Sequence, residues 1–204
     1  MAIVDTYLTL KEQSEGIYKE KGSKFIAYAA PCSSEEEAKI MLHEWRKAHH
    51  QARHLCYAYR FDLDKSIYRV NDDGEPSNSA GQPILGQIQS FDLTNVLVGV
   101  VRYFGGKKLG VGGLITAYKT AAKEALLSGN IIEVQVYQNF RLTFQYENLS
   151  EIMSICKQTD SLPSNQQYID SQSVLDVAIP LSKVDELKEK IKLMPIKLNN
   201  LGIY

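Results

Sequence analysis

The chain has 204 residues, of which 44% are hydrophobic and 23% are charged, a composition typical of a globular protein of one or two domains. Its net charge of −1 excludes nucleic-acid binding through overall positive charge, although local basic patches remain compatible with it. Cys32, Cys56 and Cys156 are too few and too widely spaced for a disulfide framework. The N-terminus lacks a signal-peptide pattern and no apolar run reaches about 18 residues, so we expect a cytoplasmic protein that does not span a membrane.

The first two thirds of the chain alternate between strand and helix patterns. Residues 5–10 and 24–30 read as strands, and Pro31 ends the second. A helix is expected to follow Ser34, because Glu37 stands at capping-box spacing and apolar residues then recur at helical spacing. The remaining elements predicted in this part are strands at 54–61, 66–70 and 94–103, and helices at 80–89 and 112–127.

The last third of the chain has a different order of predicted elements. Strand, helix, strand, strand, helix and a final strand follow one another, which is the ferredoxin-like order. The chain is therefore predicted to be an α+β protein of two domains, 1–136 and 137–204. These predicted elements are strands at 140–146, 166–169 and 174–179, helices at 149–158 and 184–193, and a last strand in the tail.

A glycine-rich stretch lies between the predicted strand 94–103 and the predicted helix 112–127. Five glycines fall within nine residues, with Arg102, Lys107 and Lys108 around them. Glycine allows close approach to backbone N–H groups, and the cations favour an anion such as phosphate. The spacing fits neither a Walker A loop nor a dinucleotide fingerprint, so a simple tight connection remains the alternative. The residues predicted to bind are Arg53, Arg102, Tyr103, Phe104, Gly105, Gly106, Lys107, Lys108, Gly110, Gly112 and Gly113.

Six blocks of sequence, taken together and in this order, resemble the YigZ/IMPACT family. A departure from the family pattern is Asn78-Ser79, where members usually carry Gly-Thr after the acidic block; the Ser79 hydroxyl can replace the threonine hydroxyl. The blocks are Gly-Ser-Lys-Phe-Ile-Ala (22–27), Ala-Arg-His-Leu-Cys-Tyr-Ala-Tyr (52–59), Asp-Asp-Gly-Glu-Pro-Ser (72–77), Ala-Gly-Gln-Pro-Ile-Leu (80–85), Val-Val-Arg-Tyr-Phe-Gly-Gly (100–106) and Leu-Gly-Val-Gly-Gly-Leu-Ile-Thr-Ala-Tyr (109–118).

This resemblance implies a fold and a biological setting. The expected N-terminal domain is an α/β sandwich similar to a ribosomal-protein and GHMP-kinase fold, with a left-handed crossover. The expected C-terminal domain is ferredoxin-like and resembles the last domain of elongation factor G. IMPACT proteins regulate translational initiation, and eukaryotic members do much of this through an added RWD domain that these residues do not contain. That regulatory partnership is therefore not expected to transfer.

Several residues are candidates for catalysis, although the pattern favours binding over an enzymatic role. His54 and Cys56 would share one face of a strand, as a base and a nucleophile would need, but a buried structural cysteine is the alternative. Asp73 and Glu75, next to Asp72, can bind a cation, cap a turn or hold Arg102 or Lys107 in place. No metal site and no cofactor are predicted.

Three functions remain open from the sequence. The first is a translation-associated protein that binds RNA or the ribosome through the glycine-rich basic loop. The second is a hydrolase or nucleotide-handling enzyme that uses a pocket of His, Asp, Glu and Arg side chains. The third is an adaptor that binds a protein through the same surface. Neither DNA specificity nor membrane association is predicted.

Overall fold

The computed structural model describes residues 5–203, which form two compact units. One unit runs from Leu8 to Glu133, and the other runs from Val134 to the C-terminal end and includes the N-terminal segment that ends at Tyr7. Strands β1 (Thr6–Leu10) and β7 (Ile131–Gln135) pair as a two-stranded sheet. The domain boundary predicted after residue 136 stays a prediction.

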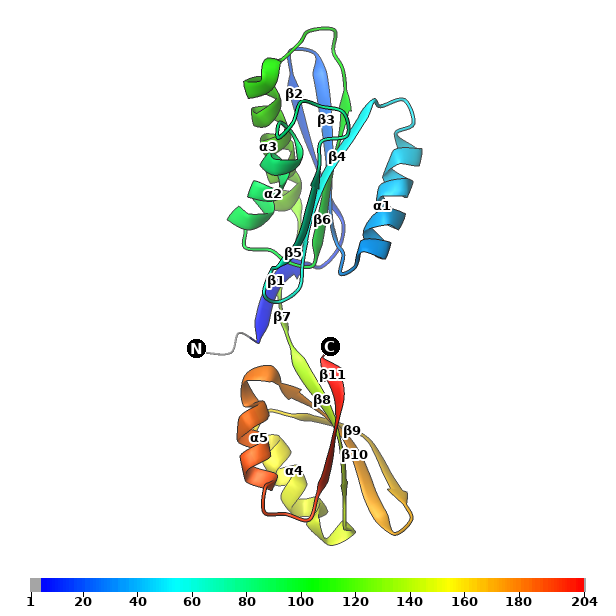
Figure 1. The fold of residues 1–204 in the computed structure, drawn as a ribbon, viewed down its shortest axis with the longest axis vertical. Helices are drawn as coiled ribbons and strands as arrows, with labels where there is room; N and C mark the ends of the chain where they lie inside the picture. The colour runs from blue at the N-terminus through cyan, green and yellow to red at the C-terminus, as the bar shows by residue number, and fades with distance from the viewer. Residues whose placement is uncertain (1–4, 204) are drawn as a thin grey trace. The chain divides into compact units, whose positions relative to one another are not determined.

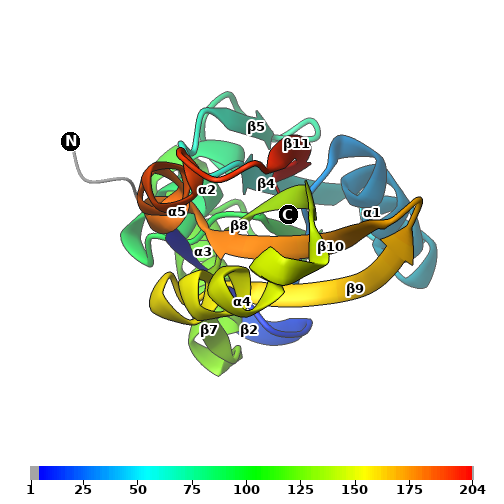
Figure 2. The same cartoon turned by 90° about the horizontal axis from the view of Figure 1, so that it is seen from below.

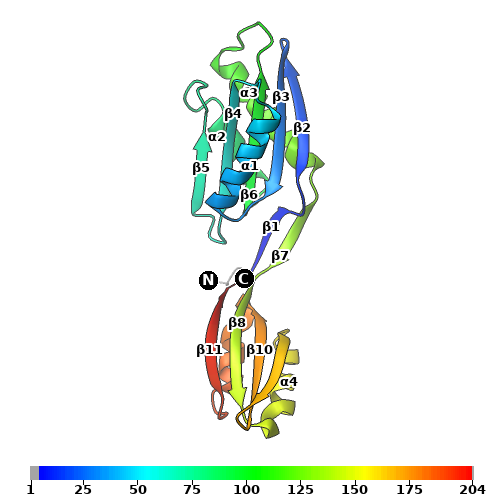
Figure 3. The same cartoon turned by 90° about the vertical axis from the view of Figure 1, so that its right-hand side faces the viewer.

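A five-stranded antiparallel sheet is the centre of the N-terminal unit, in the spatial order β2-β3-β6-β4-β5 (Figure 3). The central strand β6 is buried almost along its whole length, which is why it reads as an unbroken apolar run. The strands are β2 (Ser14–Glu20), β3 (Ser23–Pro31), β4 (His54–Phe61), β5 (Ile67–Asn71) and β6 (Val96–Tyr103).

Helices cover both faces of this sheet. Helix α1 (Glu35–Ala48) lies on one face, and helices α2 (Gly81–Ser90) and α3 (Gly110–Ser128) lie on the other (Figure 1). Alternate residues of β6 divide between the two layers: Val98 belongs to the core under α2 and α3, and Leu97 to the core under α1. The unit is therefore a three-layer sandwich with a separate core on each side of the sheet.

The connection through α1 is a crossover. Strands β3 and β4 each run antiparallel to β6, which lies between them, so β3 and β4 are parallel to each other. Helix α1 joins them across one face of the sheet, as the resemblance implied. The left hand of this crossover stays a prediction.

The C-terminal unit has the predicted ferredoxin-like order. Its four strands form an antiparallel sheet in the order β11-β8-β10-β9. Helices α4 and α5 lie next to each other, as Figures 1 and 2 show, and their buried side chains share one core with the sheet. The elements are β8 (Tyr137–Phe144), α4 (Leu149–Gln158), β9 (Leu162–Ile169), β10 (Gln172–Pro180), α5 (Val184–Ile191) and β11 (Lys197–Ile203).

Edge strands account for the main differences from the sequence prediction. Strand β2 was not predicted, because its sequence Ser-Glu-Gly-Ile-Tyr-Lys-Glu is mostly polar, as suits the edge of a sheet. Strand β9 begins at Leu162 and not at residue 166. Pro163 lies within it, and an edge strand tolerates a proline that donates no hydrogen bond.

The chain-wide expectations about cysteines and membrane helices can also be compared with the structure. All three cysteines are buried and free, so the described part of the chain contains no disulfide. No helix between residues 5 and 203 is long and apolar enough to cross a membrane.

Candidate functional site

The N-terminus of α3 is left open by the protein. Leu109 occupies the cap position, where it makes no side-chain hydrogen bond, and the first turn contains no acidic residue. The first N–H groups of a helix have no partner within the helix and carry a partial positive charge. Since α3 begins at Gly110 and not at residue 112 as predicted, the glycines at 112 and 113 belong to this first turn.

The glycines of the loop serve different purposes. Gly105 packs against the backbone of Gly22, where a Cβ atom would lie 1.9 Å from the Gly22 carbonyl carbon. Gly110 has a φ of +72°, which disfavours residues with a side chain. Gly112 has open space where a Cβ would be, so packing does not require glycine there. Its small size instead leaves the first turn of α3 accessible.

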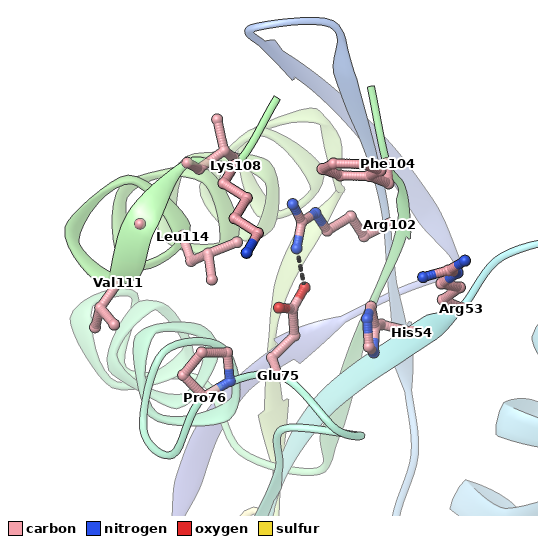
Figure 4. A pocket seen from close by; sticks show the side chains of 11 residues that line it. Arg53, His54, Glu75, Pro76, Arg102, Phe104, Lys108, Val111 and Leu114 are labelled. Atoms are coloured by element: carbon pink, nitrogen blue, oxygen red, sulfur yellow. Dashed lines mark hydrogen bonds and ion pairs between the residues drawn. The ribbon is translucent and has the colours of Figure 1, made fainter. Parts of the chain in front are cut away.

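A cavity of about 450 Å³ opens beside this helix end (Figure 4). Its walls come from the start of β4, the turn after β5, the end of β6 and the first turn of α3. It brings together residues predicted to bind, Arg53, Arg102, Phe104, Lys108 and Gly110, with two of the catalytic candidates, His54 and Glu75. The other lining residues, which the sequence did not single out, are Pro76, Leu109, Val111 and Leu114.

A buried ion pair forms the floor of the cavity. Arg102 Nη1 lies 2.6 Å from Glu75 Oε1, and the two side chains are only 9% and 4% exposed. Tyr118 Oη donates to the same carboxylate oxygen over 2.8 Å. The guanidinium lies 5.6 Å from the ring centres of both Phe25 and Phe104. Pairing, hydrogen bonding and aromatic contact together offset the cost of burying these charges.

Polar atoms of this pair remain without partners. No hydrogen bond or ion pair among residues 5–203 engages Glu75 Oε2, and in Figure 4 this oxygen faces the cavity. The Nε atom of Arg102 is buried without a partner. Lys108 extends from the loop toward the cavity in the same view (Figure 4). The cavity therefore offers both an acceptor and cationic donors to a ligand.

His54 is held in one tautomer at the cavity wall. Its Nδ1 atom lies 2.7 Å from the carbonyl oxygen of Asp73. A carbonyl oxygen only accepts hydrogen bonds, so Nδ1 carries the proton and, in the neutral ring, Nε2 is an acceptor. Among residues 5–203 no hydrogen bond engages Nε2. His54 can therefore accept a proton or a hydrogen bond from a ligand.

The acidic turn after β5 is built to position Glu75. Asp72 Oδ1 accepts from the backbone N–H groups of Ala80 (2.9 Å) and Gly81 (2.8 Å), and its Oδ2 accepts from that of Asn78 (2.8 Å). The Glu75 N–H in turn donates to the Asp72 carbonyl over 2.9 Å. Asp72 thus caps the backbone, which was one of the alternatives that the sequence left open.

Asp73 is likewise occupied within the fold. Its Oδ2 accepts from the backbone N–H of Leu55 over 2.7 Å and pairs with Arg46 of α1. Glu75, and not Asp73, is therefore the carboxylate that holds Arg102. In the described part of the chain, no group of three or more His, Cys, Asp or Glu side chains is placed to hold a metal ion.

The departure from the family pattern at 78–79 fits this turn. Asn78 has a φ of +60°, a conformation that glycine adopts freely and that asparagine tolerates better than most residues. The Ser79 hydroxyl donates to the Pro76 carbonyl over 2.6 Å. Ser79 therefore has a role in the turn that a threonine hydroxyl can also perform.

Cys56 does not have the environment of a nucleophile. Its side chain is fully buried and donates from Sγ to the Asp72 carbonyl over 3.0 Å. Burial raises its pKa, so the thiol stays protonated at neutral pH. This environment matches the alternative reading, a buried structural cysteine, and we do not propose Cys56 as catalytic.

The predicted aromatic residues divide between surface and core. Phe104 is 52% exposed at the cavity mouth, whereas Tyr118, which also lies close to the loop in sequence, is fully buried and has no ring surface free for stacking. The Tyr103 hydroxyl is bound to His49 Nδ1 over 2.8 Å, and His49 Nε2 to the hydroxyl of Tyr28 over 2.7 Å. Tyr103 lines a smaller depression of about 250 Å³, together with Gln51, Arg53, Arg102 and Phe104.

Other predicted binding residues lie in the loop but outside the lining of the cavity. Lys107 is exposed beside Lys108, Gly105 packs against the backbone of Gly22, and Gly106 is exposed with a φ of +86°. The sequence missed the role of Tyr118 in holding Glu75, because residues 43 positions apart give no pattern that reveals their contact. Leu109 and Leu114 also line the cavity. Their positions directly before and after the last glycines of the loop are the sequence signal that could have identified them.

Comparisons with known proteins agree with this architecture. Residues 21–126 match the Impact N-terminal domain. The chain is 33% identical over 173 residues to the "IMPACT family member YigZ" of Escherichia coli, and the match covers 84% of each protein. It is 32% identical over 94 residues to the "Protein IMPACT" of Oryctolagus cuniculus, and that match covers 45% of this chain and 30% of the rabbit protein. A crystal structure described as that of an hypothetical protein has a TM-score of 0.70 at 29% identity, over 96% of this chain and 97% of that chain. Because the Impact N-terminal domain spans more than half of the residues and a relative matches over most of both sequences, the chain belongs to the IMPACT family.

Proposed function

We propose that this protein acts in the control of translation by binding RNA, free or within the ribosome, through the loop and cavity at the N-terminus of α3. The similarity to proteins named IMPACT fits a translation-related regulatory role. The observation that carries the RNA contact is the uncapped helix end, which opens into a cavity lined by Arg102 and Lys108. Backbone N–H groups at a helix start and cationic side chains are the usual partners of phosphate.

The local charge supports this proposal although the net charge of the chain does not. The cavity is lined by three cations, Arg53, Arg102 and Lys108, and by one anion, Glu75. The site is thus positive within a chain whose net charge is −1. Phe104 supplies an exposed ring at the mouth, on which an unpaired base can stack.

The test is RNA binding by a variant in which the loop lysines are removed. Lys107→Ala/Lys108→Ala should weaken binding to single-stranded RNA and lower the slope of log affinity against log salt by about 1.4, or about 0.7 for each lost phosphate contact. The matched control is Lys119→Ala/Lys123→Ala, which removes two exposed lysines further along α3 and changes the net charge equally. Fluorescence anisotropy at several salt concentrations measures the affinity and its salt dependence for each variant. Equal affinity of wild type and the loop variant would contradict the proposal.

Sedimentation of tagged protein from lysate connects this binding to the ribosome. Wild-type protein should migrate with ribosomal particles, and the Lys107→Ala/Lys108→Ala variant should remain at the top of the gradient. Co-migration that survives RNase and persists in the variant would instead support the adaptor function. Arg102 is left intact in this experiment, because its removal would leave the buried Glu75 unpaired.

Phosphoester hydrolysis is the second candidate, favoured by the fixed tautomer of His54. With Nδ1 bound to the Asp73 carbonyl, Nε2 is the acceptor nitrogen of the neutral ring, and His54 lines the same cavity as the cation Lys108. Labelled RNA incubated with the protein should then be cleaved, and His54→Gln should abolish the cleavage even at RNA concentrations that saturate the variant. Intact RNA after prolonged incubation with the wild type would reject this candidate.

A further inference from the structure

We infer that the cavity accepts a ribonucleotide with free 2′- and 3′-hydroxyls, either the 3′-terminal nucleotide of an RNA or a free ribonucleoside 5′-phosphate. This inference rests on the proposed function for its phosphate contact at α3, and it names the part of the RNA that enters. The observation behind this inference is a pair of hydrogen-bond acceptors, which binding of a phosphate alone does not require. Two of the residues that line the cavity, Glu75 and His54, each keep one hydrogen-bond acceptor (Oε2 and Nε2) without a partner among residues 5–203, and the other lining residues are cationic or apolar.

The two acceptors call for donors from the ligand. Glu75 is almost completely buried, and its Oε1 atom already accepts from Arg102 and Tyr118. Its Oε2 atom faces the cavity (Figure 4), so a ligand that displaces water must supply a donor or leave a carboxylate oxygen unsatisfied. His54 Nε2 has the same need on the neighbouring wall. A ribose cis-diol carries two O–H donors side by side.

The charges in the cavity allow a phosphate and a carboxylate in the same site. Glu75 is neutralised by its ion pair with Arg102, so it acts toward a ligand as an acceptor more than as a net negative charge. Lys108 and Val111 lie on the α3 side of the cavity, whereas His54 lies on the β4 side (Figure 4). A phosphate at the helix end meets Lys108, and the ligand hydroxyls meet Glu75, at the floor between the two sides, and His54.

The size and the remaining walls fit a single nucleotide. A volume of about 450 Å³ lies within the range of pockets that enclose small ligands. Phe104, Pro76 and Leu114 provide apolar surface for the sugar and the base. A nucleotide inside an RNA chain fits less well, because its 3′-oxygen is esterified and only one hydroxyl remains for two acceptors.

The deciding experiment compares RNA ends on the wild-type protein. Oligonucleotides of one sequence, labelled at the 5′ end, are prepared with a 2′,3′-diol, a 2′-deoxy end, a 3′-deoxy end or a 3′-phosphate, and binding is measured by anisotropy. The diol should bind most tightly, each single deoxy end about tenfold more weakly, and the 3′-phosphate at least tenfold more weakly. Adenosine 5′-monophosphate should compete with the diol RNA, whereas 2′,3′-dideoxyadenosine 5′-monophosphate should not.

A variant of the acceptor gives an independent measure. Glu75→Gln keeps an oxygen for Arg102 and Tyr118 but turns an amide NH₂ toward the cavity, so the preference for the diol should fall from about tenfold to near one. Lys107→Ala/Lys108→Ala should weaken binding of all four RNA ends by the same factor. The comparison of the four RNA ends needs only wild-type protein, so it still tests the inference if Glu75→Gln fails to fold.

The outcomes separate the inference from the proposed function. Equal affinity of wild type for all four ends overturns the inference and leaves RNA binding standing. Direct binding of adenosine monophosphate, measured by calorimetry, that is tighter than binding of its dideoxy analogue and occurs without any RNA binding supports a free nucleotide as the ligand and overturns the proposed function. No binding of RNA or nucleotide overturns both.

Discussion

The N-termini of α1 and α3 differ in how their first backbone N–H groups are satisfied. At α1, the Ser34 hydroxyl accepts from the backbone N–H of Glu37 over 3.2 Å, and the Glu37 carboxylate accepts from that of Ser33 over 2.8 Å. At α3, Leu109 offers no side-chain acceptor and the first turn has no acidic residue. The chain can close a helix end with its own side chains, and at α3 it does not.

The surroundings of the two ends show what this difference is for. Three glutamates, Glu35, Glu36 and Glu37, stand in the first turn of α1 and repel an external anion. Lys108 precedes α3, and Arg102 lies in the floor of the cavity that Lys108 also lines. A helix end that is both uncapped and surrounded by cations is suited to a ligand, whereas the end of α1 is complete without one.

The largest expected effect is at the open end, in the ion pair that supports its cavity. Arg102→Ala leaves Glu75 as an unpaired buried charge and should lower the free energy of unfolding by about 3–5 kcal/mol. Urea denaturation followed by the fluorescence of Trp45, the single tryptophan, reports on the N-terminal unit. Arg102→Met/Glu75→Gln, which removes both charges, should recover most of this loss. Equal stability of Arg102→Ala and wild type would mean that the pair does not hold the cavity together.

A smaller effect is expected at the closed end. Ser34→Ala removes the side-chain cap of α1 and should cost about 1 kcal/mol of unfolding free energy in the same assay. Ser34→Asp retains an acceptor for the Glu37 N–H and should stay within about 0.5 kcal/mol of wild type. Should the alanine and aspartate variants unfold at the same urea concentration, the contrast between the two helix ends would lose its energetic basis.

The smallest effect is a difference in response to acid. The Ser33 N–H, and after it the Ser33 hydroxyl, hold the pKa of Glu37 below its usual value of 4.5. A lowered pKa means that the stabilisation is present above pH 4.5 and is lost as the pH falls through the lower value in the folded state. In an NMR titration, the amide signal of Glu37 should shift below pH 4.5, and Glu37→Gln should abolish that shift. The amides of 110–113 should show no matching transition, and one there would contradict the contrast.

Much of the fold was predictable because local patterns and tertiary structure agree. Ser34 and Glu37 marked the start of α1, and the order of elements after residue 137 gave the ferredoxin-like sheet, both of which the structure confirms. The polar edge strand β2 was missed because its stability comes from pairing with β3 and not from its own composition. Local patterns describe buried faces well and edges poorly.

The site was predictable in its residues but not in their roles. The loop and the acidic turn were both identified, yet three neighbouring acids differ in function: Asp72 caps a turn, Asp73 pairs with Arg46, and Glu75 pairs with Arg102. Nothing local distinguishes them, because each role depends on which distant element packs against the turn. Tyr118 illustrates the same limit, since no local pattern indicates that its buried hydroxyl holds Glu75.

The close contact between β2 and α3 has a consequence for how the protein is made. The Ser14 hydroxyl donates to the Ala125 carbonyl over 2.7 Å across 111 residues of sequence, and a Cβ on Gly16 would lie 2.3 Å from the Ala125 nitrogen. On a translating ribosome, β2 emerges long before the helix against which it packs, so the N-terminal unit cannot complete its core until α3 has been synthesised. A nascent chain stalled before residue 110 would hold β2 and β3 with one face of their sheet still uncovered.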